Sequence, residues 1–161
     1  MIFSFLLRLL HIYQSDFNEG KYWKRRLYLQ KQGGVKAAYY ILYCRREESK
    51  KCASTGIGLP DFCCQISEPI RLPHGLNGIV IARNVKIGRN VAIYQHVTIA
   101  ESNKQKYTII EDDVIIGAGA VILNNVHIGR GAKIGANAVI VCNVPAYSTA
   151  VGVPARIILK K

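Results

Sequence analysis

Residues 110–145 read IEDDVI, IGAGAV, ILNNVH, IGRGAK, IGANAV and IVCNVP, so that isoleucine begins every group of six. A small or branched residue stands four positions after each isoleucine, and glycine, asparagine or aspartate fills many of the positions between them. A second run with the same spacing lies upstream, at Ile81, Ile87, Ile93 and Ile99. The chain is therefore built on a repeat of six residues.

A period of six excludes an ordinary amphipathic helix, because residues six apart scatter around a helix axis. In an extended chain, offsets of four and six are both even, so both apolar positions point to the same side. Glycine, asparagine and aspartate tolerate the turns between short strands. Each group of six is therefore predicted to be a strand and a turn, stacked so that the isoleucines form one buried column.

The repeat resembles that of the hexapeptide-repeat acyltransferases, and VGVPARI at residues 151–157 is a second mark of this family. The resemblance implies a mainly β protein, a left-handed parallel β-helix with three groups of six in each triangular coil. It also implies a homotrimer or a dimer of trimers with active sites between subunits. We expect the β-helix over residues 57–161 and a helical segment over residues 1–56 that caps the first coil.

The first 56 residues favour helices. Residues 35–48 are predicted to form a helix whose apolar face holds Ala38, Ile41 and Leu42. The opening run MIFSFLLRLLHIY is broken by Arg8 and is too short to span a bilayer. We expect a packed amphipathic helix there, with weak contact to a membrane surface as the alternative.

The chain carries a formal net charge of +12 at pH 7, and the basic excess is spread along its length. No nucleic-acid-binding motif accompanies this charge. A polyanionic cofactor such as coenzyme A, an acidic membrane surface or a plain basic surface each explain it. The five cysteines are odd in number and fit no zinc-ligand spacing, so we expect no metal and a reducing compartment, the cytoplasm.

The regular spacing is interrupted at residues 71–81, which read RLPHGLNGIVI. An interruption that contains a histidine is a candidate site, because imidazole titrates near neutral pH and can act as a general base. The segment resembles the serine acetyltransferases, and its Pro-His-Gly-Leu form resembles a branch associated with capsular and exopolysaccharide synthesis. The resemblance implies that His74 is the catalytic base, with a structural turn histidine as the alternative. His11 is set aside in the N-terminal helix, and His127 in an exposed turn.

The sequence departs from the serine acetyltransferase pattern around this histidine. Pro73 stands where the family has an aspartate, and Lys106 and Tyr107 stand where it has an arginine and a histidine. Asp61 is the nearest carboxylate that could orient the base, and a backbone carbonyl is the alternative. We expect Lys106, Tyr107 and His96 to bind the acceptor, although His96 also fits a plain surface position. A tyrosine suits stacking on a sugar ring better than it suits holding a carboxylate.

The family resemblance places the pantetheine arm of coenzyme A along two small turns and its phosphates near basic side chains. Turn geometry alone also explains the glycines. The expected cofactor-binding residues are Gly117, Ala118, Gly119, Lys133, Gly135, Ala136 and Arg156.

The sequence therefore predicts an acetyl-CoA-dependent O-acetyltransferase that acts on a hydroxyl of a sugar or polysaccharide precursor. Two alternatives stay open. The first is a serine O-acetyltransferase of cysteine biosynthesis, which the departures at Pro73 and Tyr107 disfavour. The second is a non-catalytic β-helix that binds a partner, which the presence of His74 in an interrupted coil disfavours.

Overall fold

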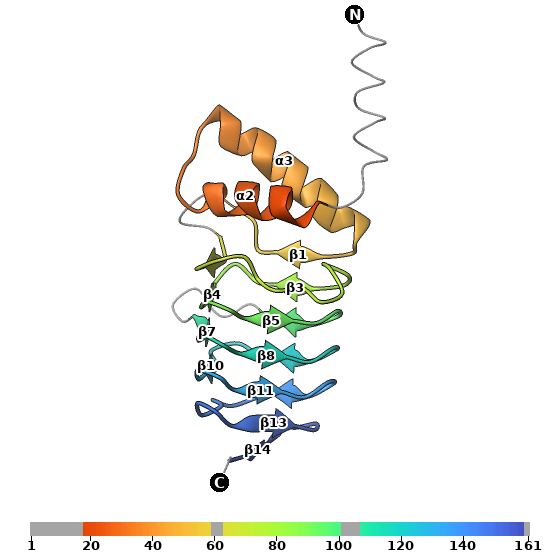
Figure 1. Cartoon of the computed structure of the whole chain (residues 1–161), viewed down its shortest axis with the longest axis vertical. Helices are drawn as coiled ribbons and strands as arrows, with labels where there is room; N and C mark the ends of the chain where they lie inside the picture. The colour runs from red at the N-terminus through yellow and green to blue at the C-terminus, as the bar shows by residue number, and fades with distance from the viewer. Residues whose placement is uncertain (1–17, 59–62, 101–106, 160–161) are drawn as a thin grey trace, which may run out of the picture.

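The computed structural model describes residues 18–58, 63–100 and 107–159. It is a parallel β-solenoid of stacked triangular coils, with two helices lying across the first coil (Figure 1). The predicted fold class, a mainly β left-handed parallel β-helix with a helical N-terminal part, is confirmed. The predictions for the opening helix, for Asp61 and for Lys106 fall outside the described residues.

The strands form three sheets, one for each face of the triangular prism. Sheet A contains β1 (Ser54–Thr55), β3 (Val80–Ile81), β6 (Thr98–Ile99), β9 (Val121–Ile122) and β12 (Val139–Ile140). Sheet B contains β2 (Gln65–Ile66), β4 (Val85–Ile87), β7 (Thr108–Ile110) and β10 (His127–Ile128). Sheet C contains β5 (Ala92–Ile93), β8 (Ile115–Ile116), β11 (Lys133–Ile134), β13 (Thr149–Val151) and β14 (Arg156–Ile158).

Neighbouring strands of each sheet come from successive coils and pair in parallel. The exception is β14, which turns back and pairs with β13 in the antiparallel direction. At the other end, β1 pairs with β3 through Ser54 and Val80. Sheet A thus begins upstream of residue 57, and the proposed division of the chain at residue 56 stays a prediction.

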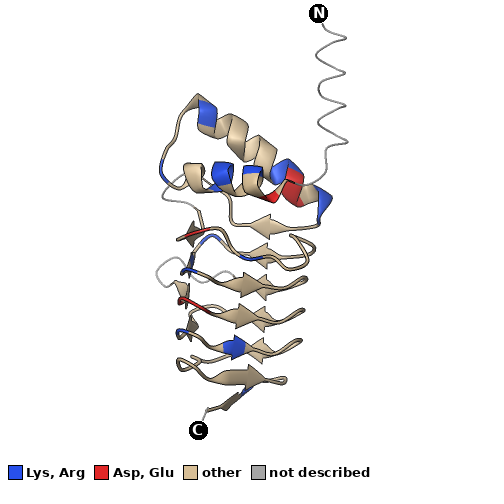
Figure 2. Ribbon diagram, viewed as in Figure 1, with Lys and Arg blue, Asp and Glu red and all other residues tan. Residues whose placement is uncertain are grey.

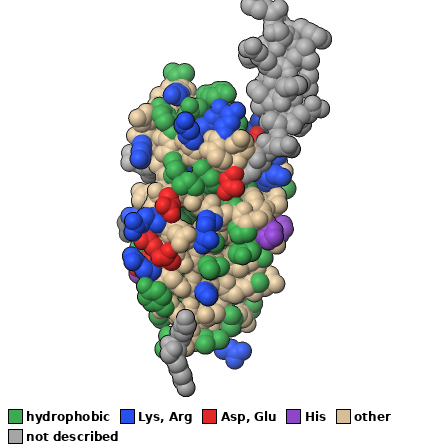
Figure 3. Space-filling view, in the orientation of Figure 1, with side chains coloured by type: hydrophobic (Ala, Val, Ile, Leu, Met, Phe, Trp, Pro, Cys, Tyr) green, Lys and Arg blue, Asp and Glu red, His purple; other side chains and the backbone are tan. Residues whose placement is uncertain are grey.

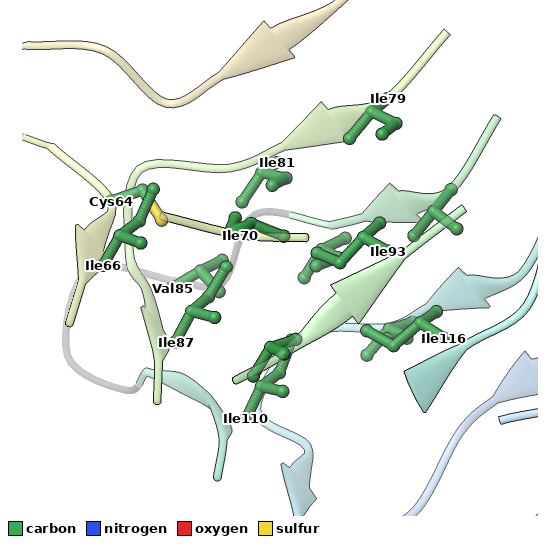
Figure 4. Packing of buried hydrophobic residues seen from close by; sticks show 14 of the residues in the cluster. Cys64, Ile66, Ile70, Ile79, Ile81, Val85, Ile87, Ile93, Ile110 and Ile116 are labelled. Atoms are coloured by element: carbon green, nitrogen blue, oxygen red, sulfur yellow. The ribbon is translucent and has the colours of Figure 1, made fainter. Parts of the chain in front are cut away.

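The interior is a column of aliphatic side chains stacked from coil to coil (Figure 4). The stacked partners in the first two regular coils are Ile81 with Ile99, Ile87 with Ile110 and Ile93 with Ile116. Each of these side chains is at most 2% exposed. Burying one such side chain contributes about 1.5–3 kcal/mol, so the column holds the coils in register.

The edge that joins sheet B to sheet C shows why turn residues fill the repeat. One residue of each turn adopts a left-handed backbone, with φ between 54° and 64° at Asn90, Asp113, Gly131 and Tyr147. Glycine, asparagine and aspartate take this conformation most readily. The spacing of polar and small residues in the sequence therefore follows from the corners of the prism.

Charged residues of both signs lie in the turns along the same edge (Figure 2). Asp112 accepts a hydrogen bond from the main-chain nitrogen of Arg89 and pairs with the guanidinium groups of Arg89 and Arg130, at 3.0 and 3.4 Å. The main-chain bond and the Arg89 side chain hold the pKa of Asp112 below its ordinary value. These exposed pairs tie successive turns together, although each contributes little alone.

The two helices pack on the first coil. Asn18 caps α2 (Glu19–Leu29) by accepting a hydrogen bond from the main-chain nitrogen of Lys21. The prediction of a helix at residues 35–48 agrees with α3 (Val35–Lys50). No helix among the described residues is long and apolar enough to cross a bilayer.

The predicted apolar face of α3 is wrong at two of its three residues, whereas Ile41 is half-buried and packs against the core. Ala38 and Leu42 are exposed, and the buried residues of the helix are instead Ala37, Cys44, Glu47 and Glu48. Helical spacing alone did not predict the buried face, because this helix turns the carboxylates of Glu47 and Glu48 inward.

Glu48 is only 4% exposed, and three hydrogen bonds compensate for its burial. Its Oε1 accepts hydrogen bonds from the hydroxyl of Tyr22 and from the main-chain nitrogen and hydroxyl of Thr55. Arg26, fully buried, donates to the carbonyl oxygens of Thr55 and Cys64 at 2.9 and 3.0 Å. This polar cluster joins α2, α3 and the first coil.

Candidate active site

One edge of the prism collects most of the residues for which the sequence predicted a role. It consists of the turns that lead from sheet C to sheet A, and we call it the His74 edge. Its turns, in order down the stack, are residues 72–79, 94–97, 117–120 and 135–138. The residues predicted from the sequence that lie on it are His74, His96, Gly117, Ala118, Gly119, Gly135 and Ala136.

His74 lies in the enlarged turn of the first coil, and its side chain is exposed. Its ring faces the ring of Tyr94 in the coil below, with 5.6 Å between ring centroids and 50° between ring planes. The carbonyl oxygen of His74 accepts a hydrogen bond of 2.9 Å from Nδ2 of Asn77. Within the described residues, no hydrogen bond to the imidazole itself is found. None of the described residues thus occupies the ring nitrogens.

His96 lies one coil below the turn that contains His74. It adopts a left-handed backbone with φ 59°, and its side chain is exposed. Its main-chain nitrogen donates to the carbonyl oxygen of Asn77 at 2.9 Å. The structure thus brings His96 to the His74 edge, as its predicted role requires, and binding of the acceptor stays a prediction.

The glycine turns lie below the histidines. A β-carbon on Gly117 would stand 2.6 Å from the main-chain nitrogen of Ala136, and one on Gly119 would stand 2.2 Å from Oδ1 of Asn137. Close stacking of the coils therefore requires these glycines, whatever else they do. Over the described residues, the main-chain nitrogens of Ala118 and Ala136 donate to no main-chain carbonyl. Ala118 and Ala136 lie in successive coils, so each of these two coils offers one main-chain hydrogen-bond donor along this edge.

Two predicted basic residues lie near the lower turns. Lys133 is exposed on β11, immediately before the turn that contains Gly135. Arg156 is exposed on β14 and pairs with Val151, whose side chain covers Gly135 from below. Their positions agree with a role in binding phosphates beside the edge, and that role stays a prediction.

Tyr107 lies on a different edge, where sheet A leads into sheet B. Its ring sits beneath the ammonium group of Lys86, at 4.3 Å from Nζ to the ring centroid. His127, expected in a turn, lies in β10 instead, with Nε2 at 2.8 Å from Oε1 of Glu111. Within one chain, Tyr107 is therefore not part of the His74 edge.

A groove of about 620 Å³ lies between α3 and the upper strands of sheet A. Its lining includes Arg45, Ser49, Val80, Arg83 and Thr98, and it does not include His74. In Figure 3, the most visible histidine atoms (purple) lie at the right of the view, and the cluster of charged side chains (blue and red) lies at the left.

Sequence reasoning missed the two residues that contact His74, which are Tyr94 and Asn77. The three extra residues of the enlarged turn break the six-residue register, so spacing does not say which side chain of the next coil lies beneath it. Asn77 left a weak signal, because an asparagine three residues after a turn residue often closes that turn through its side chain.

Residues 107–142 match the family described as bacterial transferase hexapeptide (six repeats). The serine acetyltransferase of Bacillus licheniformis is 42% identical over 92 residues, which are 55% of this chain and 42% of that protein. The structure of soybean serine acetyltransferase complexed with serine matches with a TM-score of 0.68 and 31% identity, over 85% of this chain and 54% of that one. Serine acetyltransferase of Brucella abortus in complex with coenzyme A matches with a TM-score of 0.70 and 29% identity, over 88% and 54%.

Residues 107–142 therefore match the hexapeptide transferase model, and the chain is similar in sequence and in structure to serine acetyltransferases. It spans about half the length of the relatives that it matches. The resemblance to the capsular and exopolysaccharide branch is not supported, and neither is the alternative of weak contact with a membrane surface.

The predicted sugar acceptor is wrong, because the similar proteins are serine acetyltransferases. The prediction rested in part on stacking of a sugar on Tyr107, and in the structure the ring of this tyrosine instead contacts the ammonium group of Lys86.

Proposed function

We propose that the chain is an acetyl-CoA-dependent serine O-acetyltransferase in which His74 is the general base. One observation carries the proposal: the exposed imidazole of His74, which forms no hydrogen bond with the described residues, lies in the first turn of an edge of small turns, in a chain similar to serine acetyltransferases. Two of the similar structures are described as complexes, one with serine and one with coenzyme A. The same two ligands are proposed for this chain.

In the proposed reaction, an imidazole nitrogen of His74 takes the proton from the serine hydroxyl while that oxygen attacks the carbonyl carbon of the thioester. The bond from carbon to sulfur then breaks. The protonated imidazole returns the proton to the departing thiolate, so the products are O-acetylserine and coenzyme A with a free thiol. The exposed position of His74 suits a group that must meet both substrates.

Acetyl-CoA is proposed to lie along the turns below His74. Successive coils are about 4.8 Å apart, and the main-chain nitrogens of Ala118 and Ala136 donate to no main-chain carbonyl among the described residues, so carbonyl groups of an extended pantetheine arm can meet both. The absence of large side chains at these turns permits that approach. Lys133 and Arg156 are proposed to pair with the phosphates.

Serine is zwitterionic, so its site needs groups for both a carboxylate and an ammonium. His96 is proposed to contribute from the same edge. Tyr107 and its sequence neighbour Lys106 are proposed to contribute from the next subunit of a homotrimer, because Tyr107 lies away from the His74 edge of its own chain. The proposed location is the cytoplasm, in keeping with five free cysteines.

The test is the release of free thiol from acetyl-CoA in the presence of serine, measured for the unaltered protein, for His74→Ala and for His127→Ala. Removing the base is expected to lower turnover about 10²–10⁴-fold with little loss of coenzyme A affinity. His127, which lies in sheet B and pairs with Glu111, provides the matched control and should leave turnover unchanged. Coenzyme A binding without any turnover of serine would favour the non-catalytic alternative, and near-normal turnover of His74→Ala would refute the assignment of the base.

A further inference from the structure

A general base works only when its ring is held at the correct angle to the proton that it removes. Among the described residues, no side chain or carbonyl forms a hydrogen bond to the His74 imidazole. The residue before it, Pro73, has no polar side chain. Within the part of the chain that the structure describes, the contacts that can orient the ring are therefore of another kind.

The first such contact is made by Asn77, which bridges two coils. Its carbonyl oxygen accepts a hydrogen bond from the main-chain nitrogen of His96, at 2.9 Å. Its side-chain nitrogen donates to the carbonyl oxygen of His74, also at 2.9 Å. A carbonyl can only accept, so the amide nitrogen must be the atom that faces it. Asn77 thus fastens the main chain of His74 to the coil below.

The two ends of the turn are fixed independently of Asn77. At the start, the main-chain nitrogen of Gly75 donates to the carbonyl oxygen of Leu72 at 3.0 Å. At the end, the main-chain nitrogen of Gly78 donates to the carbonyl oxygen of Lys51, just after α3, at 2.8 Å. Losing the Asn77 side chain should therefore loosen the centre of the turn without unfolding the coil.

The second contact is made by the ring of Tyr94, which lies in the first turn below His74. The tilt of 50° and the centroid distance of 5.6 Å place the two rings within the range of aromatic contacts. Tyr94 is half-buried, whereas His74 is exposed, so the tyrosine is the fixed partner and the histidine rests on it. This contact selects one side-chain rotamer of His74.

We infer that Asn77 and Tyr94 are positioning residues for His74: Asn77 fixes its main chain and Tyr94 fixes its ring. The inference rests on the proposed function, because it gives the two residues a purpose only if His74 acts on a substrate. The contacts themselves can be tested without any turnover.

For Asn77, the test is Asn77→Asp, which keeps the size of the side chain and removes the amide donor. The control is Asn90→Asp, which removes the amide that Asn90 donates to Asp113 at 2.7 Å, on the edge between sheets B and C. We expect Asn77→Asp to lower kcat about 10–100-fold with the KM for acetyl-CoA unchanged, because only the alignment of the base is lost. Asn90→Asp should lower the melting temperature and leave kcat unchanged. Equal kcat in both variants would overturn the role of Asn77.

For Tyr94, the test compares Tyr94→Phe with Tyr94→Leu. Phenylalanine keeps the ring, so kcat should stay within about two-fold of the unaltered protein, whereas leucine should lower it about ten-fold. Nuclear magnetic resonance gives a readout that does not depend on activity. The ring protons of His74, assigned by their loss in His74→Ala, should shift in Tyr94→Leu, which removes the ring current, and should stay in place in Tyr94→Phe. Unshifted protons in Tyr94→Leu would overturn the contact.

The outcomes separate this inference from the proposed function. If His74→Ala abolishes turnover while Tyr94→Leu and Asn77→Asp retain full kcat, the base is correct and the positioning roles are wrong. If His74→Ala retains turnover, the proposed function fails. In that case Asn77 and Tyr94 have no positioning role in catalysis, even if the resonances of His74 shift as expected.

Discussion

The imidazole of His96 rests on the α-carbon of Gly78, so that a β-carbon at Gly78 would stand 2.2 Å from Nδ1 of His96. Gly78 also adopts a left-handed backbone, with φ 63°. One glycine therefore sets both the end of the enlarged turn and the place of the second histidine of the site.

Replacing Gly78 with alanine should displace His96 and disturb the enlarged turn. Gly75→Ala is the matched control, because Gly75 has a similar φ of 66° and open space where a β-carbon would go. Both variants should lose about 1–2 kcal/mol of stability from backbone strain, and Gly78→Ala should lose more because of the clash. Thermal unfolding measures this difference. Equal melting temperatures for the two variants would contradict the contact between His96 and Gly78.

The variant His96→Ala should mainly raise the KM for the acceptor, since His96 is proposed to bind the acceptor and not to take its proton. Steady-state kinetics at saturating acetyl-CoA separate the two effects. A fall in kcat with an unchanged acceptor KM would instead make His96 the base, and His74 would then need another role.

The stability of the protein should depend on the charge of Glu48. Burial is the largest influence on this carboxyl and raises its pKa, although its hydrogen bonds and the nearby Arg26 oppose the shift. The folded protein therefore holds the proton at pH values where the unfolded chain has lost it. The stabilisation is complete below the ordinary pKa of a glutamate and is lost as the pH rises through the raised value.

Glu48→Gln is always neutral and can still accept from Tyr22 and Thr55, so its stability should match the unaltered protein at acid pH and exceed it at higher pH. Glu48→Ala should cost about 2–4 kcal/mol, because it leaves buried donors without an acceptor. Denaturant unfolding across pH 4–8 measures both. A constant difference between the glutamine variant and the unaltered protein over this range would rule out a raised pKa.

The proposed site requires association of subunits, and the mass of the protein in solution should be three times that of the chain, or a multiple of it. Light scattering after gel filtration measures the mass. In addition, mixing His74→Ala with Tyr107→Ala subunits should restore activity above that of either variant, because some sites then combine two intact halves. A fully active monomer would refute the shared site.

The fold could be predicted from the sequence because the six-residue spacing of the isoleucines is compatible with stacked strands and not with a helix. An isoleucine such as Ile116 has a fixed distance to the next isoleucine, and only an extended chain places both on one side. The face of α3 could not be predicted in this way, because the partners of Glu48 lie on other elements, Tyr22 on α2 and Thr55 on β1.

The site was predictable only in part. His74 and the glycine turns are marked by a break in the repeat and by its smallest residues, and the structure places them on one edge. The edge on which Tyr107 lies could not be predicted, because the enlarged turn at residues 72–79 and the insertion between Ile99 and Ile110 both interrupt the six-residue spacing. The sugar acceptor was predicted from Pro73, from Tyr107 and from the resemblance to the capsular and exopolysaccharide branch, and none of these shows where an acceptor binds.

Each group of six residues advances the chain by one of the three faces of the solenoid, so the number of groups decides on which edge a given turn lies. Removing one group of six residues below β6 would turn every later corner by a third of a revolution, so the turn of Gly117 would leave the His74 edge although each isoleucine kept an inward place. Removing three groups together would shorten the stack and return the corners to their original alignment. The length of this protein can therefore change in whole coils without scrambling the column of small turns, whereas any other change in length relocates it.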